Sequence, residues 1–169
     1  MAVEIERKFL VRDRSWQPDA RGETLVQGYL AKGERAAVRV RVKGAQAFLT
    51  VKAAVKGTTR SEFDYVVPMD DAETMLRNLC AQPLIEKTRY RLPLAPVTFE
   101  IDVFAGANVG LIIAEVELPS ADAPFPQPSW LGPEVTDDMR FFNAYLDDKP
   151  FTSWGVSYDR LLRELDGAR

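Results

Sequence analysis

Acidic and basic side chains recur at every second position in the first stretch of the chain. Within residues 3–11, Glu4, Glu6 and Lys8 are spaced two apart. A β-strand places alternate side chains on opposite faces, so these three charged groups would share one face. Two carboxylates followed by an ammonium group suit the joint binding of a divalent cation and an anion. The same row also fits an edge strand with a solvated charged face, which is the commoner outcome for such a pattern.

The charges of the later segments are sorted by sign, because each segment carries mainly cations or mainly carboxylates. The cationic positions are Arg39, Arg41, Lys52, Lys87 and Arg89. The paired carboxylates are Glu4 and Glu6, Glu100 and Asp102, and Glu115 and Glu117. Like charges side by side on one face repel each other, so a merely solvated face would gain from interleaving the signs. Sorting is useful when a ligand sits between the two sets, which favours a metal-complexed polyphosphate over a plain solvated sheet.

The charged segments have the period of β-strands. Residues 38–43 are the clearest case, because three valines fall on one face and Arg39, Arg41 and Lys43 on the other. We expect eight such strands between about residues 2 and 118, and eight antiparallel strands can close around side chains or one small ligand. Closure also removes exposed sheet edges. We therefore predict an α+β fold, a closed eight-stranded antiparallel β-barrel with a charged interior and helices packed on the outside.

Two segments switch to the helical period, residues 70–80 and residues 138–146. Each has an apolar stripe, and we expect both to cover the apolar outer face of the barrel. A third amphipathic segment, residues 156–165, is compatible with three positions: plugging one tunnel mouth, packing on the wall or mediating dimerisation. We expect a single domain over residues 1–169, with the C-terminal helical part at about residues 133–169.

Composition limits the chemistry. The chain has no histidine and a single cysteine, Cys80. Ser–His and Cys–His catalytic arrangements are therefore excluded and a zinc site is disfavoured, so a bound metal would be a hard cation held by carboxylates. An internal disulfide is excluded as well, which fits a reducing compartment, and we expect a cytoplasmic location.

Net charge and hydropathy limit the partners. The formal net charge is −3, and no basic and aromatic surface stripe is evident, so we expect no nucleic-acid partner. No apolar run approaches the roughly 18 residues of a membrane span, and Glu4 and Glu6 stand where a signal peptide would be apolar. We expect a small polyphosphate substrate and no membrane, and we leave a homodimer open.

The order of the charged pairs resembles a known family. The stretch Glu4-Ile5-Glu6-Arg7-Lys8 matches the E-x-E-x-K signature of the CYTH superfamily, the triphosphate tunnel metalloenzymes. It is followed in order by Arg39-x-Arg41, Thr50-x-Lys52, Arg60-x-Glu62, Glu86-Lys87-Thr88-Arg89-Tyr90, Glu100-x-Asp102 and Glu115-x-Glu117. The later proline-rich connector is also similar to the short bacterial members. The resemblance implies an eight-stranded antiparallel tunnel that binds triphosphate with Mg²⁺ or Mn²⁺.

The resemblance also implies roles for single residues. The implied metal ligands are Glu4, Glu6, Glu100, Asp102, Glu115 and Glu117. The implied phosphate-binding residues are Lys8, Arg39, Arg41, Lys52, Arg60, Lys87 and Arg89. The implied catalytic residues are Lys8, Tyr29 and Glu62. Lys8 would lie near the attacking water, as its base or its orienter, and a base would need a lowered pKa, which cationic neighbours would supply. Tyr29 either partners Lys8 or packs in the core.

Within this family, metal-dependent hydrolysis of inorganic tripolyphosphate to diphosphate and phosphate is our first prediction. The chain is short and has no obvious additional segment to build a nucleobase or thiazolium pocket. A thiamine triphosphatase or a class IV adenylyl cyclase is the alternative among enzymes. A polyphosphate or nucleotide sensor without turnover is the alternative outside them.

Overall fold

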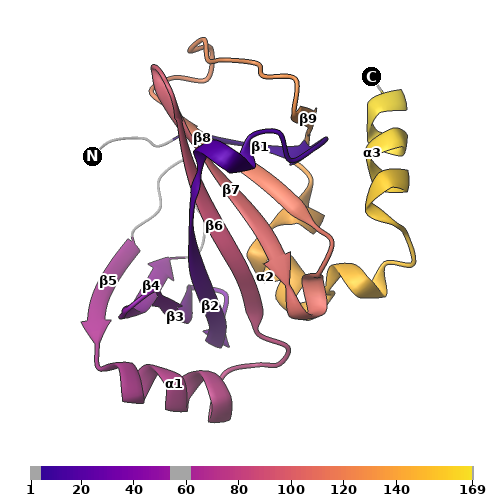
Figure 1. Ribbon diagram of the computed structural model, residues 1–169. Helices are drawn as coiled ribbons and strands as arrows, with labels where there is room; N and C mark the ends of the chain where they lie inside the picture. The colour runs from indigo at the N-terminus through magenta and orange to yellow at the C-terminus, as the bar shows by residue number, and fades with distance from the viewer. Residues whose placement is uncertain (1–4, 54–61, 169) are drawn as a thin grey trace.

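The computed structural model of the protein describes residues 5–53 and 62–168. Over these ranges it has one antiparallel sheet of nine strands, three α-helices and several single 3₁₀ turns (Figure 1). The strands are β1 (Ile5–Val11), β2 (Arg21–Lys32), β3 (Ala36–Lys43), β4 (Gln46–Ala53), β5 (Glu62–Val67), β6 (Ile85–Leu94), β7 (Val97–Ala105), β8 (Ile112–Leu118) and β9 (Leu131–Glu134). The helices are α1 (Met69–Asn78), α2 (Asn143–Asp148) and α3 (Tyr158–Gly167).

The sheet is strongly curved but its two edges do not meet. Its strand order is β5-β4-β3-β2-β6-β7-β8-β1-β9, so within the described ranges no ladder joins β5 to β1. The expectation of a closed eight-stranded barrel is therefore not met by this open, nine-stranded sheet. The alternation of side chains determines which face a residue occupies, but it does not determine whether two remote edges pair.

The ninth strand was not foreseen from the sequence. β9 pairs with β1 at Phe9 and Val11 and contains Pro133. Proline lacks an N–H group, so a proline within a short run argues against a strand unless the strand lies at an edge. β9 is such an edge strand at the end of the sheet order.

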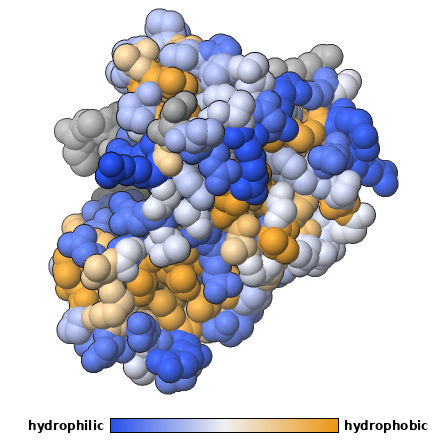
Figure 2. All heavy atoms as spheres, viewed as in Figure 1, coloured by the Kyte–Doolittle hydropathy of each residue, from blue (hydrophilic) through white to orange (hydrophobic). Residues whose placement is uncertain are grey.

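The face of the sheet without the charges is apolar and covered, as predicted. Over β2, β3 and β4 it is covered by α1, whose Ala72 and Leu76 are buried in one cluster with Val40. Over the other strands it is covered by chain segments that bring in Trp16 and Trp130. Figure 2 shows that apolar side chains nevertheless reach the surface near β5 and α1. The exposed residues there are Phe63, Tyr65, Val66 and Leu79.

The segment expected as a helix over residues 138–146 lies elsewhere than predicted. It forms a 3₁₀ turn followed by α2, and Phe141 and Leu146 are buried. Their cluster includes the strand residues Leu10, Ile85, Phe104 and Ile113. These four residues are in phase with Lys8, Lys87, Asp102 and Glu115. α2 therefore covers one end of the charged face, because four strands change from charged to apolar along that same face.

The last helix packs against the sheet in the same buried cluster as α2, at the apolar end of the charged face. α3 contacts β9, and its Leu161 is buried. The Tyr158 hydroxyl accepts a hydrogen bond from the Val11 N–H at 2.8 Å and lies 2.8 Å from the Ile112 carbonyl oxygen. These contacts tie the start of α3 to β1 and to the start of β8. Among the described residues, none of the helices has the length and hydropathy of a membrane span.

Candidate active site

Strand pairing gathers the predicted carboxylates on one part of the sheet. Glu6 lies opposite Glu117, and Lys8 lies opposite Glu115. Glu115 in turn lies opposite Glu100 on the next strand. Directly opposed residues of an antiparallel pair project from the same face, so β1, β8 and β7 present one acidic surface that contains a single lysine among these five residues.

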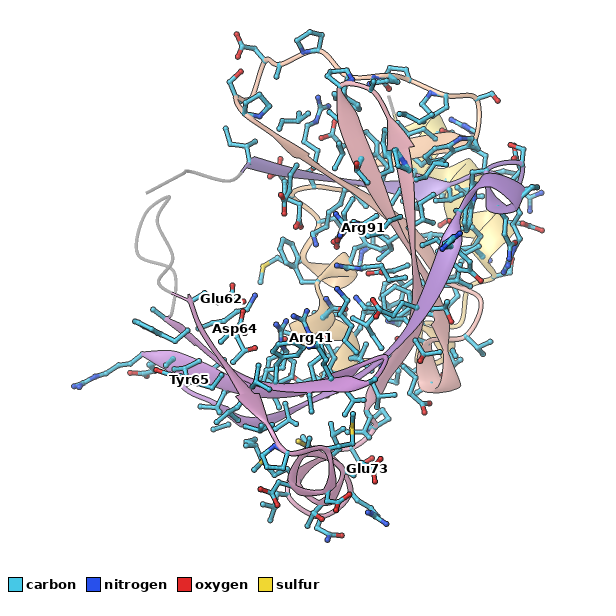
Figure 3. The ribbon with its side chains drawn as sticks, turned by 60° about the vertical axis from the view of Figure 1, so that its left-hand side comes forward. Arg41, Glu62, Asp64, Tyr65, Glu73 and Arg91 are labelled. Carbon is cyan, nitrogen blue, oxygen red and sulfur yellow. The ribbon has the colours of Figure 1, made fainter. Side chains whose placement is uncertain are left out.

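The predicted cations occupy the same face on neighbouring strands. Arg39 lies opposite Thr50, and Lys52 lies opposite Glu62. Lys52 Nζ is 3.1 Å from a Glu62 carboxylate oxygen. Figure 3 shows Arg41, Glu62 and Asp64 pointing from one wall into the concave side of the sheet, with Arg91 pointing inward from the facing wall. We call this continuous surface the charged face.

Asp102 is the centre of a buried ion-pair network. Its side chain is 1% exposed and accepts hydrogen bonds from Lys87 Nζ at 2.6 Å and from Arg89 Nε and Nη2 at 2.7 Å each. Burial raises the pKa of Asp102, but Lys87 and Arg89 outweigh that effect and lower the pKa to about 2. Burial is also the main reason that the pKa of Lys87 is lowered. Asp102 therefore holds two of the predicted phosphate-binding cations in place.

Lys8 has carboxylates as its charged neighbours. Its Nζ atom is 2.8 Å from a Glu6 oxygen and 2.7 Å from a Glu115 oxygen. Burial lowers the pKa of Lys8, but the attraction of Glu115 and Glu6 outweighs it, and the pKa lies above its ordinary value. Lys8 is therefore surrounded by carboxylates and not by the cations that would favour its role as a base.

A cavity of about 310 Å³ opens beside these acids, and its lining includes Glu6, Glu100, Glu115 and Glu117. Carboxylate oxygens suit a hard cation such as Mg²⁺ or Mn²⁺, so the donor chemistry of the cavity fits the predicted metal. Among the described residues, however, no three acidic side chains converge closely enough to hold one ion. Glu6 and Glu115 both bind Lys8 instead.

The chain is similar to a known protein family and to known proteins. The model of the CYTH domain matches residues 2–144 of the chain. The chain belongs to the CYTH family. An inorganic triphosphatase of Acetivibrio thermocellus is 41% identical over 154 residues, which span 91% of this chain and 99% of that protein.

Two further matches are also to proteins named inorganic triphosphatases. An inorganic triphosphatase of Nitrosomonas europaea is 39% identical over 151 residues, covering 85% of this chain and 96% of that protein. The crystal structure of an inorganic triphosphatase superposes with a TM-score of 0.70 at 35% identity, covering 87% of this chain and 95% of that chain. These relatives are matched over nearly their whole length.

Glu4 and Arg60 lie outside the described residues, so the CYTH signature is placed here only from Ile5 onward. Tyr29 lies opposite Arg39, and its ring centroid is 4.9 Å from Lys32 Nζ. Tyr29 therefore stands on the cationic part of the charged face, and its role towards Lys8 stays a prediction.

Two residues that the sequence did not single out reach the site from α2 and the residue before it. Asn143 Oδ1 is 3.4 Å from Lys87 Nζ, and the Phe142 ring centroid is 5.1 Å from Lys8 Nζ. Both come from a segment more than 50 residues away in sequence from Lys87. No local pattern marks such a contact, because it depends on where the C-terminal part of the chain docks.

Proposed function

We propose that this CYTH protein hydrolyses inorganic tripolyphosphate to diphosphate and phosphate in a metal-dependent reaction. The observation that carries the proposal is the division of one continuous face into a cationic part and a carboxylate part. A polyanion complexed with a divalent cation complements both parts at once. The inorganic triphosphatases that the chain resembles over 96–99% of their length support the same activity.

The cationic part would bind the phosphates. We assign this role to Arg39, Arg41, Lys52, Lys87 and Arg89, together with Arg60 and Lys8. Guanidinium groups offer two parallel donors to phosphate oxygens, and lysines add compact charge. Asp102, bound to Lys87 and Arg89, is better suited to positioning these cations than to ligating a metal. Glu62, within 4 Å of Lys52 and Arg39, would orient cations in the same way.

The carboxylate part would hold the metal. We assign Glu6, Glu115 and Glu117 to it, with Glu4 from the signature and Glu100 at the edge of the same cavity. A bound Mg²⁺ or Mn²⁺ ion would neutralise phosphate charge and help to generate the nucleophilic water.

The rest of the chemistry is positioning, because phosphoryl transfer requires little from a protein beyond alignment and charge neutralisation. Water attacks the terminal phosphorus and releases its proton to solvent, the bridging P–O bond breaks, and the electron pair of that bond leaves with diphosphate. Lys8, held between Glu6 and Glu115, is placed to orient that water or a terminal phosphate oxygen. With carboxylate neighbours it acts as a donor rather than as the base. Tyr29, which lies on the cationic part of the charged face, would act as the partner of Lys8.

We infer further that the curved sheet closes into a tunnel around the ligand. β5 and β1 stand at the two sides of its opening, and anion binding by cations on β3 and β4 together with Lys8 on β1 would draw them together.

We also infer one domain, because Leu161 of α3 shares a buried cluster with Leu10 and Ile113 of the sheet. A cytoplasmic location is inferred from the absence of a cysteine pair.

Parallel assays with tripolyphosphate, ATP and thiamine triphosphate test the activity. We expect Mg²⁺- or Mn²⁺-dependent release of equimolar diphosphate and phosphate from tripolyphosphate, resolved by phosphorus NMR and abolished by a chelator. Equal or faster turnover of an organic triphosphate would contradict the substrate assignment. Formation of cyclic AMP would instead establish a cyclase, and tight binding without turnover would establish a sensor.

A further inference from the structure

Gln27, in the middle of β2, has a buried side-chain amide nitrogen that finds no acceptor in the part of the chain that the structure describes. Its side chain is 1% exposed, and among the described residues its Nε2 group has no hydrogen-bond acceptor. Most buried polar groups in folded proteins are hydrogen-bonded, because losing water without gaining a partner destabilises the fold. An orphaned primary amide therefore calls for a physical reason.

The position of Gln27 in the sheet supplies one. Gln27 lies directly opposite Arg41 on β3, so both project from the charged face. It is also two residues from Tyr29 and thus in phase with it. The neighbouring strand adds Arg39, another buried residue of the same face.

The groups left without partners around Gln27 are all donors. The Nε atoms of Arg39 and Arg41 are buried and lack an acceptor in the described part of the chain, just as Gln27 Nε2 does. Burial and the positive charges of Arg39 and Arg89 lower the pKa of Arg41, which reflects a local excess of cations. Three donors that lack an acceptor in the described part of the chain, on two adjacent strands, are complementary to an oxygen-rich anion.

We propose that Gln27 is a further phosphate-binding residue, whose Nε2 donates a hydrogen bond to a phosphoryl oxygen that Arg39 and Arg41 also contact. The identity of the anion as tripolyphosphate rests on the proposed function. A neutral donor suits this position, because a third cation beside two arginines would be repelled. Gln27 adds a directed hydrogen bond without adding charge. Ligand entry moves the guanidinium groups onto the anion and brings its oxygen within reach of the amide.

Substitution Gln27→Met tests this assignment, because methionine has nearly the same length and no donor. The unliganded variant should melt at the same temperature as the parent or higher, since an unpaired buried amide is replaced by an apolar group. Its affinity for tripolyphosphate, measured by calorimetry without metal, should fall about ten-fold or more, as expected for a lost hydrogen bond to a charged group. KM should rise by a similar factor, with a smaller change in kcat.

The matched control is Gln17→Met. Gln17 lies on the other side of the sheet, and its amide has a partner, the Tyr90 hydroxyl at 3.5 Å. Its replacement should leave the affinity for tripolyphosphate unchanged. Gln27→Glu serves as the second variant, since it keeps the shape and replaces the donor by a negative charge. It should weaken binding more than Gln27→Met does.

The outcomes separate this inference from the proposed function. If Gln27→Met binds tripolyphosphate as tightly as the parent, or melts lower with unchanged affinity, then the amide is structural and the inference is wrong. If the parent binds tripolyphosphate without hydrolysing it and Gln27→Met binds more weakly, the hydrolase proposal fails and the Gln27 assignment stands. A parent protein that does not bind tripolyphosphate overturns both.

Discussion

Lys8 and Asp102 each stand among charges of the opposite sign. Lys8 lies between Glu6 and Glu115 in the carboxylate part, and Asp102 binds Lys87 in the cationic part. Clusters of like charge are unfavourable in a partly buried site unless they are compensated. These two residues act as internal counter-ions that let a sorted charged face exist in a folded protein. Loss of Asp102 should therefore have a different effect from the loss of a ligand-binding group.

At this scale the first prediction concerns the carboxylates of the cavity. Glu6→Gln keeps the size of the side chain and removes its negative charge, so it should lower kcat/KM for tripolyphosphate by about a hundred-fold or more, comparable to losing one group that stabilises a transition state. The melting temperature should change little, because Glu6 is half exposed. Glu73→Gln on α1, which Figure 3 shows away from the charged face, is the control. Full activity of Glu6→Gln would refute the metal-site assignment.

The second prediction concerns Asp102. Asp102→Asn leaves Lys87 and Arg89 without their shared counter-ion, so the free energy of unfolding should fall by about 3–5 kcal/mol, the usual loss when one partner of a buried ion pair is removed. Urea denaturation of the unliganded protein measures it. Asp122→Asn, which changes an exposed carboxylate in the connector before β9, should have no comparable effect. A loss no larger than that of the control would mean that the network contributes nothing to stability.

At the scale of elements, α2 links the C-terminal end of β2 to the candidate active site. Lys32 on β2 forms an ion pair at 2.6 Å with Asp147, whose side chain is fully buried. The same Lys32 Nζ donates to the Ala144 carbonyl oxygen at 3.2 Å. These contacts hold α2 against β2, while Phe142 and Asn143 approach Lys8 and Lys87. α2 thus serves as a wall for the lysines of the charged face.

The third prediction follows from that attachment. Lys32→Met leaves the buried Asp147 carboxylate unpaired and should lower the free energy of unfolding by about 3 kcal/mol. It should also raise KM for tripolyphosphate, because α2 no longer holds its residues against the two lysines. Lys149→Met, an exposed lysine just after α2, is the matched control and should change neither quantity. If both variants behave alike, α2 is not held by Lys32.

At the scale of the whole molecule, the open side of the sheet is the main feature. β5 ends the sheet, and its Phe63, Tyr65 and Val66 are exposed. An edge strand with few buried contacts opens more readily than the central strands. A ligand that binds both parts of the charged face would stabilise the arrangement in which β5 approaches β1.

The fourth prediction measures that closure. With tripolyphosphate in excess over its Kd, amide hydrogen exchange in residues 62–67 should slow about ten-fold or more, because a bound ligand stabilises the closed state by mass action. The amides of α3, which packs against β9 at the end of the sheet order opposite to β5, provide the internal reference and should change less. Orthophosphate, which cannot span the face, should produce a smaller effect. Unchanged exchange in residues 62–67 at saturating tripolyphosphate would show that the sheet stays open.

The sequence by itself determined which side chains share the charged face and how their signs are sorted. Arg39 and Arg41, and likewise Glu115 and Glu117, fall on that face because a strand alternates its side chains with a period of two. The stripe of α1 likewise specified its contact with the apolar face. The ordered pairs of charges were also sufficient to indicate the CYTH family.

Only the tertiary structure decided which of these groups meet and where the sheet ends. It showed the open edge at β5, the docking of α2 over one end of the charged face, the pairing of Lys8 with Glu115 and the burial of Gln27. Each depends on contacts between segments remote in sequence. A local pattern records the face on which a side chain lies, whereas the distance between two segments depends on the packing of the whole chain.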